Sequence, residues 1–350
     1  MNRKTLLTAC LALAAEFTFI AVAQNPTATI GNGQIKATLY LPDSKIGYYR
    51  GTRFDWSGVV SSLEYAGHSY YGPWFDQTRP SVTDYIYDGA NIVTGPCSNM
   101  MGVAEEFTND EHMALGWDDA KVGGTFIKIG VGVLRKPDDA PYSNFRLYDI
   151  VNGGKWTVRK TSNSVEFVQE LSDPASGYGY VYTKRVSLTS GKPQMVLEHS
   201  LLNTGKRTID ASVYDHNFTS IDKQAPGPGL TIQFGFKAQM FATSDPKLAE
   251  LLILTGSQAT LAKTLAGEDK VAALFGGFGP DAKDYDIRIE DHKAGAGVRA
   301  TGDRPLSRVA LWGIRSVISP EPFIDMSIEP GSSFTWKITY DYYTLPKDAK

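Results

Sequence analysis

A histidine flanked by an acid, an amide and aromatic residues stands in the middle of the sequence, as Tyr214-Asp215-His216-Asn217-Phe218. An imidazole titrates near neutral pH, so it can both donate and accept a proton there. Aromatic rings can pack against the C–H faces of a sugar, and the polar side chains can bind its hydroxyl groups. This mixture of residue types indicates a carbohydrate site in which His216 is the acid–base group.

The residues ahead of His216 predict two β-strands joined by a tight turn, within residues 195–218. Apolar residues dominate the first strand. In the second, Ile209, Ala211 and Val213 alternate with Asp210 and Ser212, which is the period of a half-buried strand. The turn contains Gly205, which can adopt the positive φ of a short hairpin. We therefore expect a hairpin whose second strand ends at His216.

The ordered set of strand, Asn-Thr-Gly turn, strand and histidine with an aromatic neighbour resembles the central hairpin of galactose mutarotases (aldose 1-epimerases) and their relatives. The run Gly58–Leu63 and the turn at Pro330-Gly331 resemble two other hairpins of that family. The resemblance implies an all-β fold, a large antiparallel β-supersandwich. It also implies that His216 is the general acid and that the enzyme needs no cofactor. Asp215 stands where many members have asparagine.

Interconverting sugar anomers needs an acid and a base on opposite sides of one ring. In the family that His216 resembles, the base is a glutamate on a C-terminal strand. The comparable strand here, Val309–Ser316, has no carboxylate. Glu321 follows it and is the first candidate for the base, although an exposed loop glutamate is an equally good interpretation. Glu105 or Glu106 is the second candidate for the base.

Other polar residues are candidates for sugar binding. Arg53 or Arg79 is similar in position to an arginine that binds hydroxyl groups in the family, and the sequence does not decide between them. His112 lies in the interval of the family's second active-site histidine, and Arg315 suggests an acidic sugar such as a uronate. The predicted substrate-binding set is completed by Glu105, Glu106, Tyr214 and Asp215.

Composition excludes some functions and favours a β-rich fold. The net charge of −3 shows no excess of basic residues, so we expect no nucleic-acid partner. The 18 Tyr, 16 Phe and 34 Gly favour strands and turns. The histidines lack the close spacing of a zinc site, so we predict no catalytic zinc.

The first 23 residues read as a signal peptide. Arg3 and Lys4 precede an apolar stretch, and Ala21-Val22-Ala23 is a small-x-small cleavage site before Gln24. We expect a periplasmic or secreted protein without a membrane span after the signal is removed. Lipidation at Cys10 is an alternative. The mature chain then has one cysteine, Cys97, which is expected to be a buried small hydrophobe.

Residues 24–350 are predicted to form one domain. Residues 33–41, 58–65, 179–188 and 309–318 are among the expected strands, and Ser244–Pro246 could begin a short helix through Leu251. Residues 74–117 are expected to be irregular because they are rich in Gly, Pro, Asn and Asp. Many strands at short spacing favour a large antiparallel sandwich.

The sequence therefore predicts an exported protein that binds a mono- or oligosaccharide and acts as an aldose 1-epimerase. Two other functions stay open. One is a glycan-binding module without catalysis, and the other is a polysaccharide lyase or hydrolase, because one fold can carry several activities. The sequence does not identify the sugar or the oligomeric state.

Overall fold

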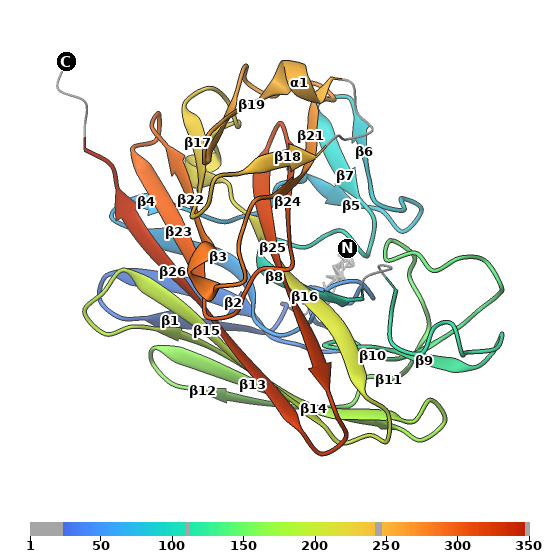
Figure 1. Ribbon diagram of the computed structural model, residues 1–350. Coiled ribbons are helices and arrows are strands. Elements are labelled where there is room, and N and C mark those ends of the chain that lie inside the picture. The colour runs from blue at the N-terminus through green and yellow to red at the C-terminus, as the bar shows by residue number, and fades with distance from the viewer. Residues whose placement is uncertain (1–23, 110–112, 242–246, 347–350) are drawn as a thin grey trace, which may run out of the picture.

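The computed structural model describes residues 24–109, 113–241 and 247–346. Almost all of its regular structure is β (Figure 1), which confirms the predicted all-β class. The helices of the described residues are one short α-helix, α1 (Leu248–Leu251), and two 3-10 turns at Ile221–Lys223 and Ala282–Asp284. The expected signal peptide, residue 112 and the start of the expected helix at 244–246 lie outside the described residues.

Two large sheets form the body of the molecule. The ten-stranded sheet contains, in spatial order, β12 (Lys155–Lys160), β13 (Ser164–Asp173), β14 (Tyr178–Leu188), β15 (Gln194–Asn203), β26 (Ser333–Thr344), β23 (Ala296–Gly302), β22 (Asp286–Asp291), β17 (Leu230–Phe234), β20 (Gln258–Leu261) and β19 (Leu252–Thr255). The six-stranded sheet contains β18 (Gln239–Phe241), β21 (Lys270–Gly276), β24 (Arg308–Ile314), β25 (Val317–Ile328), β16 (Ile209–Phe218) and β8 (Gly102–Thr108).

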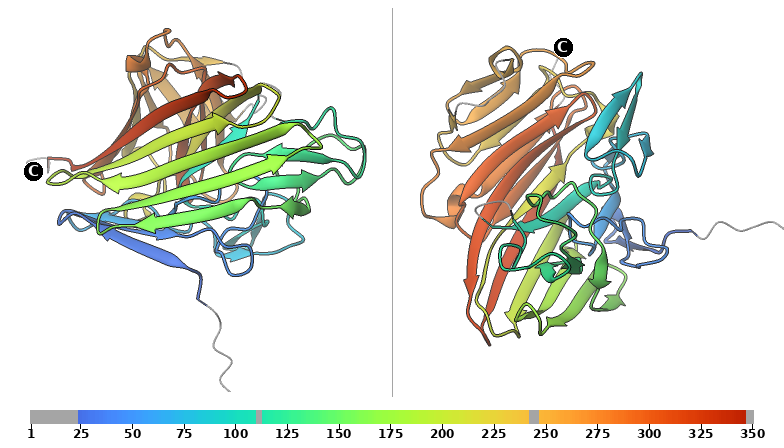
Figure 2. Two further views of the ribbon diagram at one scale, coloured as in Figure 1. Left: turned by 90° about the horizontal axis from the view of Figure 1, so that it is seen from below. Right: turned by 90° about the vertical axis from the view of Figure 1, so that its right-hand side faces the viewer.

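Three smaller sheets lie beside these two (Figure 2). The four-stranded sheet contains β1 (Thr27–Gly31), β2 (Ile35–Tyr40), β3 (Val59–Tyr65) and β4 (His68–Ser69). The three-stranded sheets contain β11 (Ile150–Asn152), β10 (Gly132–Arg135) and β9 (Thr125–Lys128), and β5 (Gln77–Thr78), β7 (Asn91–Thr94) and β6 (Tyr85–Asp88). We call the last of these the small sheet.

The two large sheets pack face to face around an aromatic core. Phe107 of β8 makes edge-to-face contacts with Tyr182 of β14 at 5.3 Å and with Trp336 of β26 at 6.1 Å between ring centres. Such offset geometries are those that aromatic rings favour in protein cores. One face of the six-stranded sheet is therefore buried against the ten-stranded sheet, and its other face is available for a site.

The predicted central hairpin is wrong in one respect. Strands β15 and β16 form as expected, but they do not pair with each other. β15 pairs with β14 and β26, whereas β16 pairs with β25 and β8, so the turn between them crosses from one large sheet to the other. Gly205 is required there for close packing, because a Cβ atom on it would lie 2.6 Å from the Gly179 nitrogen. It is not among the glycines with positive φ.

Two other predicted segments also differ from the structure. Residues 74–117 are not irregular, since they contain the small sheet and β8. The expected strand 309–318 is two strands, because β24 ends at Ile314 and β25 begins at Val317. As a result, Glu321 lies within a strand and not in a loop.

Candidate functional site

The outer face of the six-stranded sheet carries His216 and Glu321. Side chains alternate between the two faces of a strand, so His216 shares its face with Tyr214 and Phe218. Glu321 pairs with Ala310, and Ser319 pairs with Trp312, which places all four residues in two adjacent rows. The sheet therefore brings the two predicted catalytic residues together, although they lie far apart in the sequence, because β16 pairs with β25.

Backbone pairing between β16 and β25 stops where the site begins. The paired register runs from Ile209 opposite Ile328 to Tyr214 opposite Phe323. Pro322 and Pro320 follow, and proline has no N–H to donate to a neighbouring strand. The Asn217 side chain instead donates to the Pro320 carbonyl over 2.9 Å. The prolines therefore interrupt the ladder, which resumes at the bridge between Thr219 and Ile318.

His216 is buried and held from several sides. Its Nε2 lies 3.0 Å from Glu321 Oε1, and its Nδ1 is hydrogen bonded with Ser319 Oγ at 2.7 Å. Its ring stacks on Phe218 with 3.7 Å between ring centres. Burial, together with the nearby positive charge of Arg53, holds the pKa of His216 well below its usual value. The imidazole is therefore neutral at pH 7.

Glu321 has the opposite shift. Burial raises the pKa of its carboxyl group to about 8, against the smaller opposing effect of Arg53. At neutral pH the proton of the pair therefore resides on Glu321, facing a neutral imidazole. The expectation that Glu321 would stand across a sugar ring from His216 is wrong, because atoms 3.0 Å apart leave no room for a ring between them.

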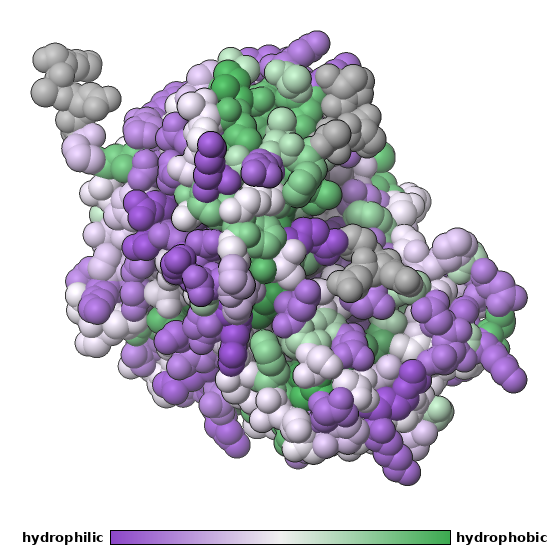
Figure 3. All heavy atoms as spheres, in the orientation of Figure 1, coloured by the Kyte–Doolittle hydropathy of each residue, from purple (hydrophilic) through white to green (hydrophobic). Residues whose placement is uncertain are grey.

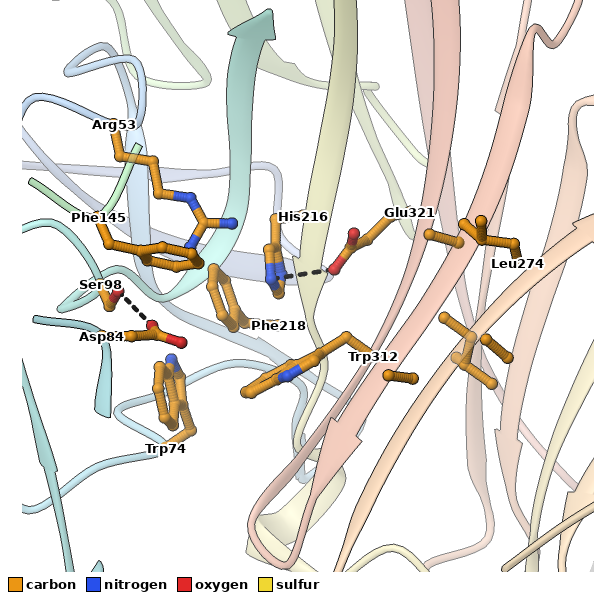
Figure 4. A pocket seen from close by; sticks show the side chains of 14 residues that line it. Arg53, Trp74, Asp84, Ser98, Phe145, His216, Phe218, Leu274, Trp312 and Glu321 are labelled. Carbon is orange, nitrogen blue, oxygen red and sulfur yellow. Dashed lines mark hydrogen bonds and ion pairs between the residues drawn. The ribbon is translucent and has the colours of Figure 1, made fainter. Parts of the chain in front are cut away.

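A cavity of about 410 Å³ opens beside this pair (Figure 4). Trp74, Phe218 and Trp312 supply aromatic surface, and the rings of Trp74 and Phe218 are parallel at 5.7 Å between centres. Polar groups gather at the end nearest His216, while Leu274 lies at the other end and is 45% exposed. In the orientation of Figure 1, apolar side chains gather over the upper part of the molecular surface (Figure 3). The cavity therefore has a polar end and an apolar end.

Arg53 brings a fixed positive charge to the polar end. Its Nε donates to Glu106 Oε2 over 2.6 Å, and a terminal nitrogen donates to the Tyr214 hydroxyl over 3.0 Å. Its guanidinium group also lies over the rings of Phe54 and Phe145, with 4.4 and 4.8 Å to the ring centres. These contacts fix the group at the edge of the cavity, where it can donate to a ligand.

Glu106 and Tyr214 support Arg53 and do not line the cavity. Burial would raise the pKa of Glu106, but the charges of Lys128 and Arg53 outweigh it and lower the pKa to about 2. Glu106 is therefore a permanent anion, and Lys128 Nζ lies 3.1 Å from its second oxygen. The Tyr214 hydroxyl also donates to Glu106, over 2.6 Å.

Glu105 and Asp215 lie on the opposite face of the sheet, in the core. The register places them directly opposite each other in β8 and β16. Glu105 forms an ion pair with Lys184 and a hydrogen bond with His199 Nε2 at 2.8 Å, and Asp215 accepts a hydrogen bond from Tyr285 over 2.9 Å. Neither lines the cavity, so their predicted role in substrate binding is not supported by their position.

The two other predicted arginines also lie away from the cavity. Arg79 is at the surface and pairs with Asp88 at 2.7 Å. Arg315 lies over the Tyr87 ring and donates to the Gly267 carbonyl over 3.1 Å. Both therefore stabilise loops near the small sheet, and the structure leaves Arg53 as the arginine of the site. His112 lies outside the described residues.

The sequence did not predict the residues that line the cavity opposite the six-stranded sheet. Trp74, Asp84, Ser98 and Phe145 line it, and the first three come from the segment expected to be irregular. Asp84 directly precedes β6 and accepts a hydrogen bond from Ser98 Oγ over 2.6 Å. A buried serine close in sequence to an acid carries no motif, so only the topology of the small sheet reveals this part of the site.

The described residues include no group of three or more His, Cys, Asp or Glu side chains that could hold a metal ion. Within the same residues, every helix is too short to cross a membrane. Cys97 is buried and unpaired, as expected.

Comparison with solved structures identifies the fold. A galactose mutarotase-like protein from Clostridium acetobutylicum superimposes with a TM-score of 0.52 at 13% identity, covering 91% of this chain and 95% of that one. A second, from Lactobacillus casei, gives 0.51 at 11% identity, covering 91% and 100%. The fold is galactose mutarotase-like. An aldose epimerase homologue from C. elegans has the same fold, with a TM-score of 0.51 at 15% identity and coverage of 92% and 100%.

At these identities the galactose mutarotase-like fold is shared without close similarity of sequence. No model of a known protein family matches the chain, and no curated protein matches it either. The shared fold does not determine the chemistry, which depends on the residues of this site.

Proposed function

We propose that this protein is an aldose 1-epimerase, which interconverts the anomers of a sugar bound in the cavity. The observation that carries the proposal is the contact between His216 and Glu321, 3.0 Å apart at the polar end of an aromatic-lined cavity. The galactose mutarotase-like fold is consistent with a sugar ligand.

The cavity has the size and chemistry that a sugar needs. Its volume of about 410 Å³ falls within the ~300–1,000 Å³ that is common for small-molecule sites. The flat faces of Trp74 and Trp312 can pack against ring C–H groups, and Arg53 can donate to hydroxyl or carboxylate oxygens.

The pair of His216 and Glu321 supplies one proton. Its carboxyl proton can pass to the ring oxygen of a sugar, either directly or through the imidazole, because the pKa of Glu321 is raised to about 8. A group that titrates close to the working pH is well matched to donating a proton and recovering it in the same cycle. The pair therefore acts as the acid of the proposed reaction.

The direct test is the equilibration of a fresh anomer. Freshly dissolved α-glucose, α-galactose and glucuronic acid should reach anomeric equilibrium faster with catalytic amounts of the protein, as followed by polarimetry or proton NMR. Binding of a sugar without any acceleration would favour a glycan-binding module. Release of new reducing ends from a polysaccharide, without acceleration, would favour the hydrolase.

We also propose that the protein acts outside the cytoplasm. The basis is the sequence of residues 1–23, with its positive start, apolar stretch and Ala21-Val22-Ala23 site. Mass spectrometry of the exported protein should find Gln24 at its N-terminus. An acylated Cys10 at that position would contradict the proposal.

A further inference from the structure

Asp84 is a carboxylate in the cavity that the pair of His216 and Glu321 does not use. It lies directly before β6, and its main-chain carbonyl accepts from Gly95 N over 2.7 Å, which anchors it to the small sheet. Ser98 Oγ donates to its Oδ1 over 2.6 Å. Among the described residues no cation forms an ion pair with it, which leaves Oδ2 available to a ligand.

Asp84 and Glu321 approach the cavity from different sheets. Glu321 projects from β25 of the six-stranded sheet, whereas Asp84 is held by the small sheet. Figure 4 shows Asp84 beside Trp74 and Ser98, with Glu321 beyond the rings of Phe218 and His216 in this view. Opening a sugar ring requires two proton-transfer groups on its opposite sides, and aromatic rings lie between Asp84 and Glu321. His216 and Glu321 are too close together to serve as two separate groups.

The environment of Asp84 suits a base. Burial raises the pKa of its carboxyl group above the usual value. The Ser98 hydrogen bond and the charges of Arg53 and Lys270 oppose that shift in part. A carboxylate that is partly desolvated and forms no direct ion pair is a stronger proton acceptor than one in water. Trp74 lies next to it in the cavity wall and would hold a sugar face against the site.

We propose that Asp84 is the catalytic base of this site, facing the acid pair of His216 and Glu321 across the sugar. This inference rests on the proposed function. The Asp84 carboxylate takes the proton of the anomeric hydroxyl, and the bond between C1 and the ring oxygen breaks. Its electron pair goes to the ring oxygen, which takes the proton from the acid pair. The open aldehyde rotates about the C1–C2 bond.

Ring closure reverses these transfers on the other face of C1. The hydroxyl formed from the ring oxygen returns its proton to the acid pair and attacks the aldehyde carbon. Asp84 gives its proton back to the aldehyde oxygen, which becomes the new anomeric hydroxyl. Both groups recover their starting states, so the cycle needs no co-reactant.

Asp84→Asn tests the assignment because it keeps the shape and removes the base. We expect the catalysed rate of anomer exchange to fall by ~10²–10⁴-fold, the usual effect of losing a positioned acid or base. The loss should appear in kcat, with the sugar affinity measured by calorimetry changing only a few-fold. Asp88→Asn is the matched control, because Asp88 belongs to the same small sheet and pairs with Arg79 at the surface. It should leave the rate unchanged.

The outcomes separate this inference from the proposed function. If the wild-type protein accelerates exchange and Asp84→Asn keeps its rate within threefold, Asp84 is not the base and the proposed function stands. A wild-type protein that binds sugar without accelerating exchange overturns both.

Ser98→Ala gives a second and independent readout. The substitution retains the Asp84 carboxylate but removes the hydrogen bond that lowers its pKa. The rate falls at acid pH when the base is protonated, so this limb of the pH–rate profile should move to higher pH in Ser98→Ala. An unshifted acid limb would count against Asp84 as the titrating base.

Discussion

Replacing Glu321 by glutamine is expected to slow the catalysed exchange of sugar anomers by ~10²–10⁴-fold. Glutamine fills the same space, but its amide is far too weak an acid to protonate the ring oxygen. His216→Ala should cause a loss of similar size, because it removes the group that faces the Glu321 carboxyl at 3.0 Å. Polarimetry under saturating sugar measures both variants, and thermal melting shows whether they remain folded.

The double variant is the sharper measurement. If His216 and Glu321 supply a single proton as one unit, the loss in the double variant should be close to the larger of the two single losses and well short of their product. Two independent groups would instead give losses that multiply. Glu329→Gln is a suitable control, since Glu329 is exposed, follows the same strand and accepts from Thr208 at 3.0 Å.

The same pair predicts the alkaline limb of the rate profile. The pKa of Glu321 is raised to about 8, so its proton is present at neutral pH and is lost as the pH rises through that value. The wild-type rate should therefore decline above a pH of about 8. Glu321→Gln should show no such limb in its residual rate. A wild-type rate that rises steadily through this range would contradict the assignment of Glu321 as the acid.

Replacing Lys184 by methionine is expected to be the most damaging change to stability. Its buried ammonium group forms an ion pair with Glu105, lies 3.7 Å from Asp55 and donates to the Ser57 carbonyl over 2.9 Å. Without it, Glu105 and Asp55 lose their lysine partner. Removing one partner of a buried ion pair typically costs ~3–5 kcal/mol of the free energy of unfolding. Urea unfolding followed by tryptophan fluorescence measures this loss.

Lys155→Met is the matched control, because Lys155 is 74% exposed and lies 3.5 Å from Glu170. It should change the free energy of unfolding by about 0.5 kcal/mol or less. Adding Glu105→Gln to Lys184→Met should recover part of the lost stability, since it removes a carboxylate left without its cation. If Lys184→Met is no less stable than Lys155→Met, the core charges are not coupled as described.

The strands of this protein could be predicted where their two faces differ in polarity. β3 and β14 formed where alternation and turn residues placed them, and the all-β class followed from their spacing. β8 was missed because Glu105 and Glu106 occupy its centre and both are buried. The alternation of apolar and polar residues does not predict a strand that buries one carboxylate on each face. The lysines that pair with these carboxylates, Lys128 and Lys184, lie in distant segments of the sequence.

The candidate site could be predicted from the sequence only in part. His216 and Glu321 were predicted from the resemblance to the mutarotase family, but their 3.0 Å contact depends on the pairing of β16 beside β25. The false hairpin of β15 and β16 shows the limit of local reasoning. A short turn between two strands predicts pairing, and here the core between the two large sheets separates them instead.

Neighbouring positions of β16 serve two unrelated tasks, since His216 faces the cavity and Asp215 faces the core charges. Gaining or losing one residue within this strand would exchange the two sets, because side chains alternate with a period of two. It would carry His216 into the core and bring Asp215 to the cavity. We therefore expect the length of β16 to be constrained more strictly than its sequence. Insertions and deletions should be tolerated in the turns at its ends and excluded between Ile209 and Phe218.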